Sequence, residues 1–147
     1  MDIRYEKINE SHFESLIALF SEFSEFEKQP DKMVNSVEQL RKEKDCINGY
    51  VALTGNEEVI GYATFFFAFF TWSGKAMYMD DLYVKKEFRG NGTGTGMMKK
   101  VIEHARKHEC YKLRWQVSRW NEPAIKFYKW VGATIDDAQM NCDLVLR

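Results

Sequence analysis

A glycine-rich segment, Arg89-Gly-Asn-Gly-Thr-Gly-Thr-Gly96, separates a stretch typical of a β-strand from a stretch typical of an amphipathic helix. Glycines allow the backbone to approach a ligand closely, and the first N–H groups of a helix attract negative charge. Arg89 adds a cation that can bind a phosphate group through two N–H donors. This arrangement predicts a phosphate-binding site, and a glycine-rich connector without a ligand is the alternative.

The two common nucleotide-binding motifs do not fit this segment. A dinucleotide fingerprint requires a third glycine three positions after its second one, and those positions hold Thr95 and Met97. A P-loop ends in Gly-Lys followed by Ser or Thr, whereas Lys99 has no glycine before it and another lysine after it. The pattern that remains is Arg-x-x-Gly-x-Gly, formed by Arg89, Gly92 and Gly94.

This remaining pattern resembles the pyrophosphate-binding signature of the GNAT family of acyl-CoA-dependent N-acetyltransferases. The resemblance implies an α/β GNAT fold, with a mixed and mostly antiparallel sheet flanked by helices. It also implies acetyl-CoA as co-substrate, bound in a splayed gap after the fourth strand, and no metal.

Acyl transfer from a thioester to an amine requires an anchored CoA, a polarised carbonyl, a neutral amine and an acid for the departing thiolate. A backbone N–H between Leu82 and Val84 can stabilise the developing oxyanion. A primary amine with a pKa of about 10 is mostly protonated at neutral pH, so a carboxylate must take its proton directly or through water. Asp80 and Asp81 lie in the same strand, but adjacent strand residues face opposite sides. At most one can face the substrate unless a bulge intervenes, and both could be structural carboxylates.

Tyr128 is the candidate for the acid. It lies in a helix that Asn121 is expected to cap, with Pro123 in the first turn, where its missing N–H costs little. A helical tyrosine beside Phe127 and Trp130 is more often a core residue. The pattern alone therefore leaves both roles open.

Two longer blocks narrow the resemblance to the diamine (spermidine/spermine) acetyltransferase branch of GNAT. They are Tyr78-Met-Asp-Asp-Leu-Tyr-Val84 and Trp120-Asn-Glu-Pro-Ala-Ile-Lys-Phe-Tyr128. The resemblance covers most of the chain. It implies that Tyr128 is the acid toward CoA, that Asp80 is the base acting through water, and that the strand carries a bulge near this point.

The resemblance also distributes the binding roles. The amine substrate is expected at Glu27, Trp72, Asp80 and Asp81. The cofactor is expected at Leu82, Tyr83, Val84, Arg89, Gly90, Asn91, Gly92, Thr93, Gly94, Thr95, Asn121, Ala124 and Tyr128.

Three departures from the polyamine branch bear on the substrate. Asp80 replaces a glutamate, Phe70 replaces an acidic residue two positions before the tryptophan of the Trp-x-Gly turn, and a glutamate and a tryptophan of the tail are missing. The paralogous thialysine acetyltransferases also lack the acidic residue before the tryptophan. A lysine-like amino acid or another small amine is therefore as plausible as spermidine.

Hydrophobic periodicity predicts the elements that position these residues. The segment 63–70 is so apolar that it is predicted to be buried on both faces at the centre of the sheet. Ser11 and Glu14 match a capping box at the start of the first helix. His104 and His108 are four residues apart, but with no third ligand they are predicted to be surface residues rather than metal ligands. The expected strands are 3–8, 49–54, 59–70, 77–84, 113–117 and 141–146, and the expected helices begin near 11, 37, 97 and 121.

Composition excludes several classes of function. The 147 residues include 21 Lys and Arg against 22 Asp and Glu, so the chain has no strong field for nucleic acid or anionic membranes. Its longest apolar run is too short to cross a bilayer. Three cysteines without metal-like spacing suit a reducing compartment, and no signal-peptide pattern is recognised, so a cytoplasmic location is expected.

The sequence therefore predicts one GNAT domain over residues 1–147 that acetylates a primary amine of a small molecule by direct attack. The expected substrate is a polyamine, a diamine or a lysine-like amino acid, and the resemblance implies a homodimer. The alternatives are acetylation of a protein or peptide amine, and a CoA-binding module without turnover.

Overall fold

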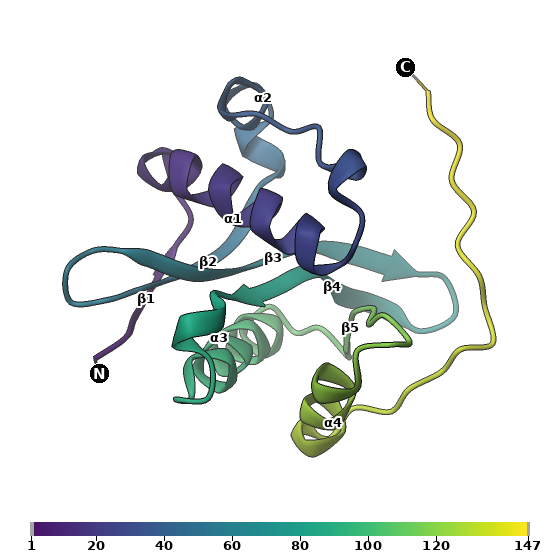
Figure 1. Ribbon diagram of the computed structural model, residues 1–147. Helices are drawn as coiled ribbons and strands as arrows, with labels where there is room; N and C mark the ends of the chain where they lie inside the picture. Colours follow the sequence, from purple (N-terminus) through teal and green to yellow (C-terminus); the bar gives the residue numbers. More distant parts are fainter. Residues whose placement is uncertain (1, 147) are drawn as a thin grey trace. The chain divides into compact units, whose positions relative to one another are not determined.

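The computed structural model describes residues 2–146, which form two compact units that meet in sequence between Gln116 and Val117. The first unit contains a five-stranded sheet in the order β1-β2-β3-β4-β5 (Figure 1). Its strands are β1 (Arg4–Lys7), β2 (Asn48–Leu53), β3 (Val59–Phe70), β4 (Gly74–Val84) and β5 (Leu113–Arg114). All neighbouring pairs are antiparallel except β4 and β5, which are parallel. This confirms the predicted mixed, mostly antiparallel sheet.

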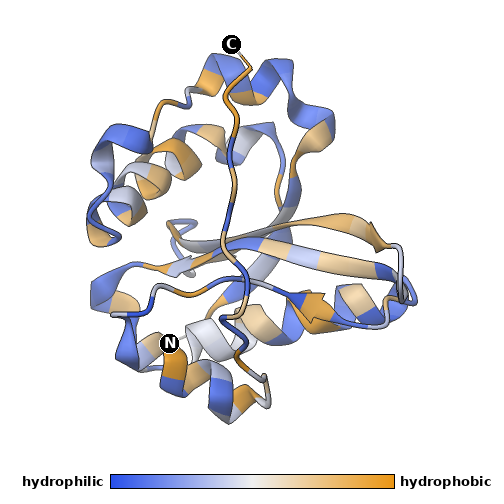
Figure 2. Cartoon of the chain, turned by 90° about the vertical axis from the view of Figure 1, so that its right-hand side faces the viewer, coloured by the Kyte–Doolittle hydropathy of each residue, from blue (hydrophilic) through white to orange (hydrophobic). Residues whose placement is uncertain are grey.

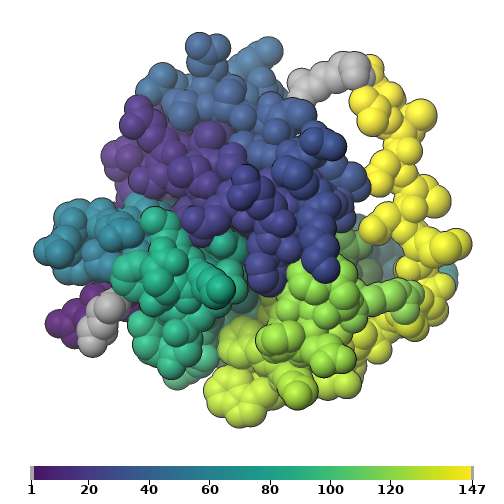
Figure 3. Space-filling model, viewed as in Figure 1, coloured from purple at the N-terminus to yellow at the C-terminus, as the bar shows by residue number. Residues whose placement is uncertain are grey.

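Helices α1 and α3 cover opposite faces of this sheet (Figure 1). The helices are α1 (Phe13–Phe26), α2 (Val37–Lys42), α3 (Thr93–Lys107) and, in the second unit, α4 (Glu122–Val131). The α1 stripe packs Phe13, Leu16 and Leu19 against the sheet, where they are almost fully buried. Figure 3 shows the atoms of α1 and α2 as one continuous layer. Among residues 2–146, none of the helices combines the length and hydrophobicity that a membrane-spanning helix requires.

A β-bulge in β4 decides which way its carboxylates face. Thr64 pairs with Asp81 and the next residue, Phe65, pairs with Met79, so Asp80 has no partner of its own on β3. An extra residue in one strand resets the alternation of side chains. Asp80 and Asp81 therefore face the same side of the sheet, which confirms the bulge that the family resemblance implied.

The outer half of the β3–β4 hairpin corrects the predicted burial of segment 63–70. Phe66, Phe67 and Phe69 are 47%, 40% and 74% exposed. The reason is length, since β3 has 12 residues and extends for roughly 40 Å. The 14 residues of α1 reach only about 21 Å, so within the first unit the helices cover one end of the hairpin.

The first helix also begins differently from the prediction. A 3-10 turn, Glu10–His12, leads into α1, which itself has no side-chain cap. Asn9 caps this turn: its side chain accepts a hydrogen bond from the Ser11 backbone N–H at 2.9 Å, and the Nδ1 of His12 accepts one from the Asn9 N–H at 3.1 Å. The prediction of a capping box formed by Ser11 and Glu14 is therefore wrong. The short turn before α1 brings the capping group two residues earlier than the periodicity suggested.

Two predicted strands near the end of the chain also differ. β5 stops at Arg114 instead of Val117, and residues 141–146 form no strand. The terminal segment alternates hydrophobic and hydrophilic residues (Figure 2) and runs as a single extended chain (Figure 3). Its apolar side chains are 82–90% exposed at Met140, Leu144, Val145 and Leu146. Alternation predicts a strand only where a neighbouring strand supplies hydrogen bonds, and this segment pairs with none of the described strands.

Candidate active site

The glycine-rich segment forms the connection from β4 to α3. Gly90 and Gly92 have positive φ angles of 83° and 88°, a conformation that glycine adopts without strain. α3 begins at Thr93 with no side-chain cap, and the N–H of Gly96 bonds to the carbonyl of Gly92. The backbone N–H groups of residues 93–95 precede this bond and point out of the N-terminal end of the helix. Apart from chain neighbours and the backbone of the helix itself, no atom of residues 2–146 lies within 4 Å of where a side chain would begin at Gly90, Gly92 or Gly94, so this backbone is open to a ligand.

Arg89 is anchored at the start of this connection. Its Nε donates a hydrogen bond to the carbonyl of Val84 at 2.7 Å. Its guanidinium carbon lies 5.0 Å from the centre of the Phe26 ring and 5.2 Å from that of Tyr83. Tyr83 in turn donates its hydroxyl to Glu22 at 2.6 Å. The Val84 bond uses Nε, and Arg89 also forms a side-chain hydrogen bond with Tyr83, so the guanidinium is held at the start of the connection.

The outer edge of β4 provides the gap that the family resemblance implied. β5 pairs with β4 only at Met77 and Tyr78. Beyond that point, Met79 and the residues from Asp81 to Val84 pair with β3 on one side and have no partner in β5 on the other. N–H groups of Leu82 to Val84 that point away from β3 are therefore available to a ligand carbonyl.

The two carboxylates of the bulge face the α1 side of the sheet. Asp81 pairs with Thr64, two residues beyond Tyr62 on β3, and Tyr62 contacts Phe20 of α1 with ring centres 5.0 Å apart. The buried Tyr62 hydroxyl donates a hydrogen bond to Asp81 at 2.7 Å. Asp81 is half-buried and Asp80 beside it is exposed. The structure thus brings together both acidic residues that the sequence assigned to the amine site.

Burial and like charge shift the acid–base equilibria of this cluster. Desolvation, followed by the charge of Asp80, raises the pKa of Asp81 to about 6, although the Tyr62 hydrogen bond works in the opposite direction. Desolvation also raises the pKa of Asp80, because protein atoms surround its carboxyl even though much of the residue is exposed. Both groups therefore hold a proton more tightly than an ordinary aspartate does.

Glu27 follows the last residue of α1. Its charge, after desolvation and the charge of Asp80, also raises the pKa of Asp81. Trp72 does not join them. It is 99% exposed in the turn between β3 and β4, and Asp81 lies seven residues beyond Gly74 along β4, a distance of roughly 23 Å.

The remaining predicted residues lie in the second unit, on and before α4. The Asn121 side chain accepts a hydrogen bond from the Ala124 N–H at 3.3 Å, and Gly132 ends the helix with a φ of 108°. Both the cap and the end of the helix agree with the interpretation of the sequence. Tyr128 is the buried residue of this helix, with its ring centre 5.6 Å from that of Phe127.

Sequence reasoning missed two features of the first unit. One is Tyr62, which donates a hydrogen bond to Asp81. A tyrosine within an apolar strand could have indicated this, because a buried hydroxyl needs a hydrogen-bond partner. The other is the environment of His104 and His108, which are half-buried rather than on the surface. Their rings stack at 4.3 Å, and His104 also contacts Tyr50 and Phe65. No group of His, Cys, Asp or Glu within residues 2–146 is arranged to hold a metal ion.

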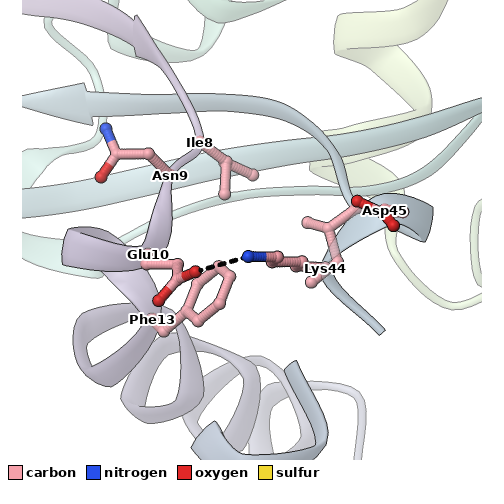
Figure 4. A pocket seen from close by; sticks show the side chains of 7 residues that line it. Ile8, Asn9, Glu10, Phe13, Lys44 and Asp45 are labelled. Carbon is pink, nitrogen blue, oxygen red and sulfur yellow. Dashed lines mark hydrogen bonds and ion pairs between the residues drawn. The ribbon is translucent and has the colours of Figure 1, made fainter. Parts of the chain in front are cut away.

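A cavity of about 260 Å³ lies elsewhere, beside the start of α1 (Figure 4). Its lining includes Ile8, Phe13 and the ion pair between Glu10 and Lys44, whose Oε1 and Nζ atoms are 3.1 Å apart. It contains none of the residues of the glycine connection or of the acidic cluster. This cavity is therefore separate from the candidate site at β4 and the start of α3.

Comparison with known proteins agrees with this geometry. Residues 13–133 match the model of the Acetyltransferase (GNAT) family. The chain belongs to the GNAT acetyltransferase family. As a GNAT protein it is an acyltransferase, and the matched region includes the bulge in β4, the glycine connection and α4.

Several relatives share much of this GNAT sequence. A thialysine N-epsilon-acetyltransferase from Caenorhabditis elegans is 38% identical over 123 residues, covering 82% of this chain and 76% of the relative. A human spermidine/spermine N(1)-acetyltransferase-like protein is 32% identical over 74 residues, covering 50% of this chain and 11% of that protein. Among solved structures, an integron cassette protein of V. cholerae has a TM-score of 0.79 at 27% identity, covering 99% of this chain and 93% of the other. These relatives support the predicted branch of the family.

Proposed function

We propose that this GNAT protein transfers an acetyl group from acetyl-CoA to a primary amine of a small molecule, either a lysine-like amino acid or a diamine or polyamine. The observation that carries the proposal is the bulge at Asp80. It turns two adjacent carboxylates to one face of β4, the strand that leads to the glycine connection, and the charge of Glu27 also acts on Asp81. Three carboxylates close together attract a cationic amine and can accept its proton. The names of the thialysine and spermidine/spermine relatives support the same substrate range.

The chain offers groups for each part of acetyl-CoA. Arg89 and the N–H groups that begin α3 would hold the pyrophosphate, and Leu82 to Val84 would donate an N–H to the thioester carbonyl. Asn121 and Ala124 would contact the remainder of the cofactor. When bound, acetyl-CoA supplies an activated acyl group whose leaving thiol is stable once protonated.

Two side chains have proposed roles in the transfer of protons, as the family resemblance implies. Asp80 takes one proton from the substrate ammonium group, directly or through water, and passes it to solvent. The neutral amine then forms the C–N bond as the C–S bond breaks. Tyr128 donates its hydroxyl proton to the departing sulfur and is reprotonated by the second proton that the nitrogen loses. The products are an acetylamide, CoA with a free thiol, and one proton in solution.

We further propose that the two units act as one acetyltransferase domain, since the family match runs from the first unit into the second. A homodimer and a cytoplasmic location also remain proposals. The cysteines Cys46, Cys110 and Cys142 are free thiols, which suits a reducing compartment.

A panel of amines tests the proposed function directly. The protein is incubated with acetyl-CoA and spermidine, putrescine, lysine, thialysine or short peptides, and products are identified by mass spectrometry. This detection avoids confusion between free CoA and the three cysteines of the protein. An acetylated small amine is the expected result. Acetylated peptides alone would indicate a protein-directed enzyme, and CoA binding without any product would contradict the proposal.

A further inference from the structure

We propose that Arg114 binds the α-carboxylate of a lysine-like substrate while the acidic pair Asp80 and Asp81 receives its ε-ammonium group. The inference rests on the proposed function and adds a second recognition site to it. The observation behind it is a row of side chains on one face of the sheet, with negative charge at one end and positive charge at the other.

The register of the strands places this row. Arg114 of β5 lies opposite Tyr78 of β4 in a parallel pair, and paired residues project to the same face. Tyr78 precedes Asp80 by two residues, which separates them by roughly 7 Å along the strand and keeps them on one face. The charges of both Asp80 and Arg114 act on the Tyr78 hydroxyl, in opposite directions. Tyr78 therefore neighbours both ends of the row: Asp80 lies two residues along β4, and Arg114 lies opposite it on β5.

The positive end contains two cations over one aromatic ring. The guanidinium carbon of Arg114 lies 4.7 Å from the centre of the Phe70 ring, and the Nζ of Lys112 lies 5.2 Å from it. Arg114 is exposed and takes part in none of the ion pairs formed within residues 2–146. Arginine binds a carboxylate through two parallel N–H groups, so this end is suited to an anion.

An apolar surface connects the two ends. The rings of Phe66 and Tyr78 stack with centres 5.2 Å apart and planes at 18°, and Phe66 is 47% exposed. Phe66 and Phe70 are four residues apart on β3, so they share the face. The methylene groups of a substrate can lie against the exposed Phe66 ring beside Tyr78 while its charged ends face Asp80 and Arg114.

Charge, rather than length, favours a lysine-like amino acid over a diamine. The carboxylate of lysine is an anion that Arg114 can bind through two N–H groups. A diamine would place its second cation beside Arg114 and Lys112, where like charges repel it. Two cations, Lys112 and Arg114, lie over the Phe70 ring, so the local charge at this end is positive.

Lysine and 1,5-diaminopentane provide a matched pair of substrates, since they differ only in the carboxylate. We expect the wild type to prefer lysine and to acetylate it at the ε-nitrogen. The Arg114→Gln variant should raise KM for lysine by about 10- to 100-fold, the range of a charge-assisted hydrogen bond, and leave kcat/KM for diaminopentane within about 3-fold. Arg114→Glu should reverse the preference toward the diamine.

The Lys75→Gln variant is the matched control. It removes one positive charge from the same hairpin, but Lys75 lies over Phe67, whose ring packs against His104 and His108 on the opposite, α3 face. This variant should leave the ratio of kcat/KM for lysine to kcat/KM for diaminopentane unchanged. Arg114 is an exposed residue, so its variants are expected to fold.

Three results would overturn the inference: equal use of lysine and diaminopentane by the wild type, an equal loss for both substrates in Arg114→Gln, or acetylation at the α-nitrogen. In each case an amine would still be acetylated, so the proposed function would stand. If no amine in the pair or in the wider panel were acetylated, the proposed function and this second site would both fail.

Discussion

Arg89 reaches back over five residues to bond the carbonyl of Val84, and the 2.7 Å contact closes the link between β4 and α3. A single guanidinium group can make this bond with Nε and still present two terminal nitrogens to a ligand. A lysine at this position carries its three donors on a single nitrogen and cannot present the planar pair of N–H groups that a guanidinium offers to a phosphate. The position therefore has a structural role and a proposed binding role that require arginine.

The Arg89→Lys variant tests this requirement. We expect its dissociation constant for CoA to rise at least about 10-fold, because a charge-assisted hydrogen bond is worth about 1.5–3 kcal/mol. Isothermal titration calorimetry with CoA measures the change. Arg106→Lys, on the exposed face of α3, is the control and should bind as the wild type does. Equal affinity in all three proteins would remove Arg89 from the cofactor site.

The glycines at the start of α3 give a second prediction, which separates a ligand site from a simple connector. Gly94 has open space around it, whereas a methyl group at Gly96 would overlap the Tyr5 hydroxyl, which donates to the Thr93 carbonyl at 3.0 Å. Gly94→Ala should raise the free energy of unfolding by about 0.5–1 kcal/mol through helix propensity. Gly96→Ala should lower it by about 1–3 kcal/mol through overpacking. Thermal and urea unfolding without ligand measure both.

CoA binding by the same variants completes the comparison. If the backbone at Gly94 approaches a phosphate, Gly94→Ala should weaken CoA binding although it stabilises the free protein. A variant that is more stable and binds CoA as well as the wild type would indicate that Gly94 is only part of a connector.

Tyr128 gives a third prediction. Removing the hydroxyl in Tyr128→Phe should lower kcat by about 100-fold or more, the range for a general acid, while CoA binding stays within a factor of about three. Single-turnover kinetics and CoA titration separate the two effects. Phe127→Leu changes a neighbouring side chain that carries no proton, so it controls for disturbed packing on α4. A kcat that is unchanged in Tyr128→Phe would leave Tyr128 as a core residue.

Local pattern was sufficient for most of the first unit. The meander of β2, β3 and β4 and the helix after the glycine connection were predicted because their turns and periodicities are local properties of the chain. The predicted cap at the start of α1 was wrong because several residues near it, including Asn9 and Ser11, can cap a helix. Only the backbone conformation decides which of them does. The predicted burial of the outer half of β3 was wrong because that burial depends on the length of α1.

The carboxylate pair shows where residue patterns alone were insufficient. Alternation by itself allowed only one of Asp80 and Asp81 to face the substrate, and only the family resemblance suggested a bulge. The pairing of Thr64 with Asp81 and of Phe65 with Met79 then confirmed it. The second unit illustrates the opposite case. Its last segment alternates as a strand does, but pairing requires a neighbour, and alternation in one chain segment cannot supply one.

The acidic cluster gives the last prediction, a dependence of stability on pH. The folded state raises the pKa of Asp81 from 3.8 to about 6, so the native protein holds this proton more tightly than the unfolded chain does. The contribution of Asp81 to stability is therefore fully present below about pH 4 and is lost as the pH rises through about 6. At pH 8 the native state must keep this carboxylate ionised beside Asp80 and Glu27.

The Asp81→Asn variant should accordingly be more stable than the wild type at pH 8, by about 1–3 kcal/mol, because the amide removes the charge and still accepts the Tyr62 hydrogen bond. The gain should disappear at pH 4, where the wild-type carboxyl is protonated in the folded state. Urea unfolding at both pH values measures it, with Asp31→Asn at an exposed site outside the cluster as the control. Because the same charge is proposed to bind the substrate ammonium, the stabilised variant should also show a higher KM for the amine. A variant that is less stable at pH 8 would mean that the Asp81 charge stabilises the fold, against the direction of its pKa shift.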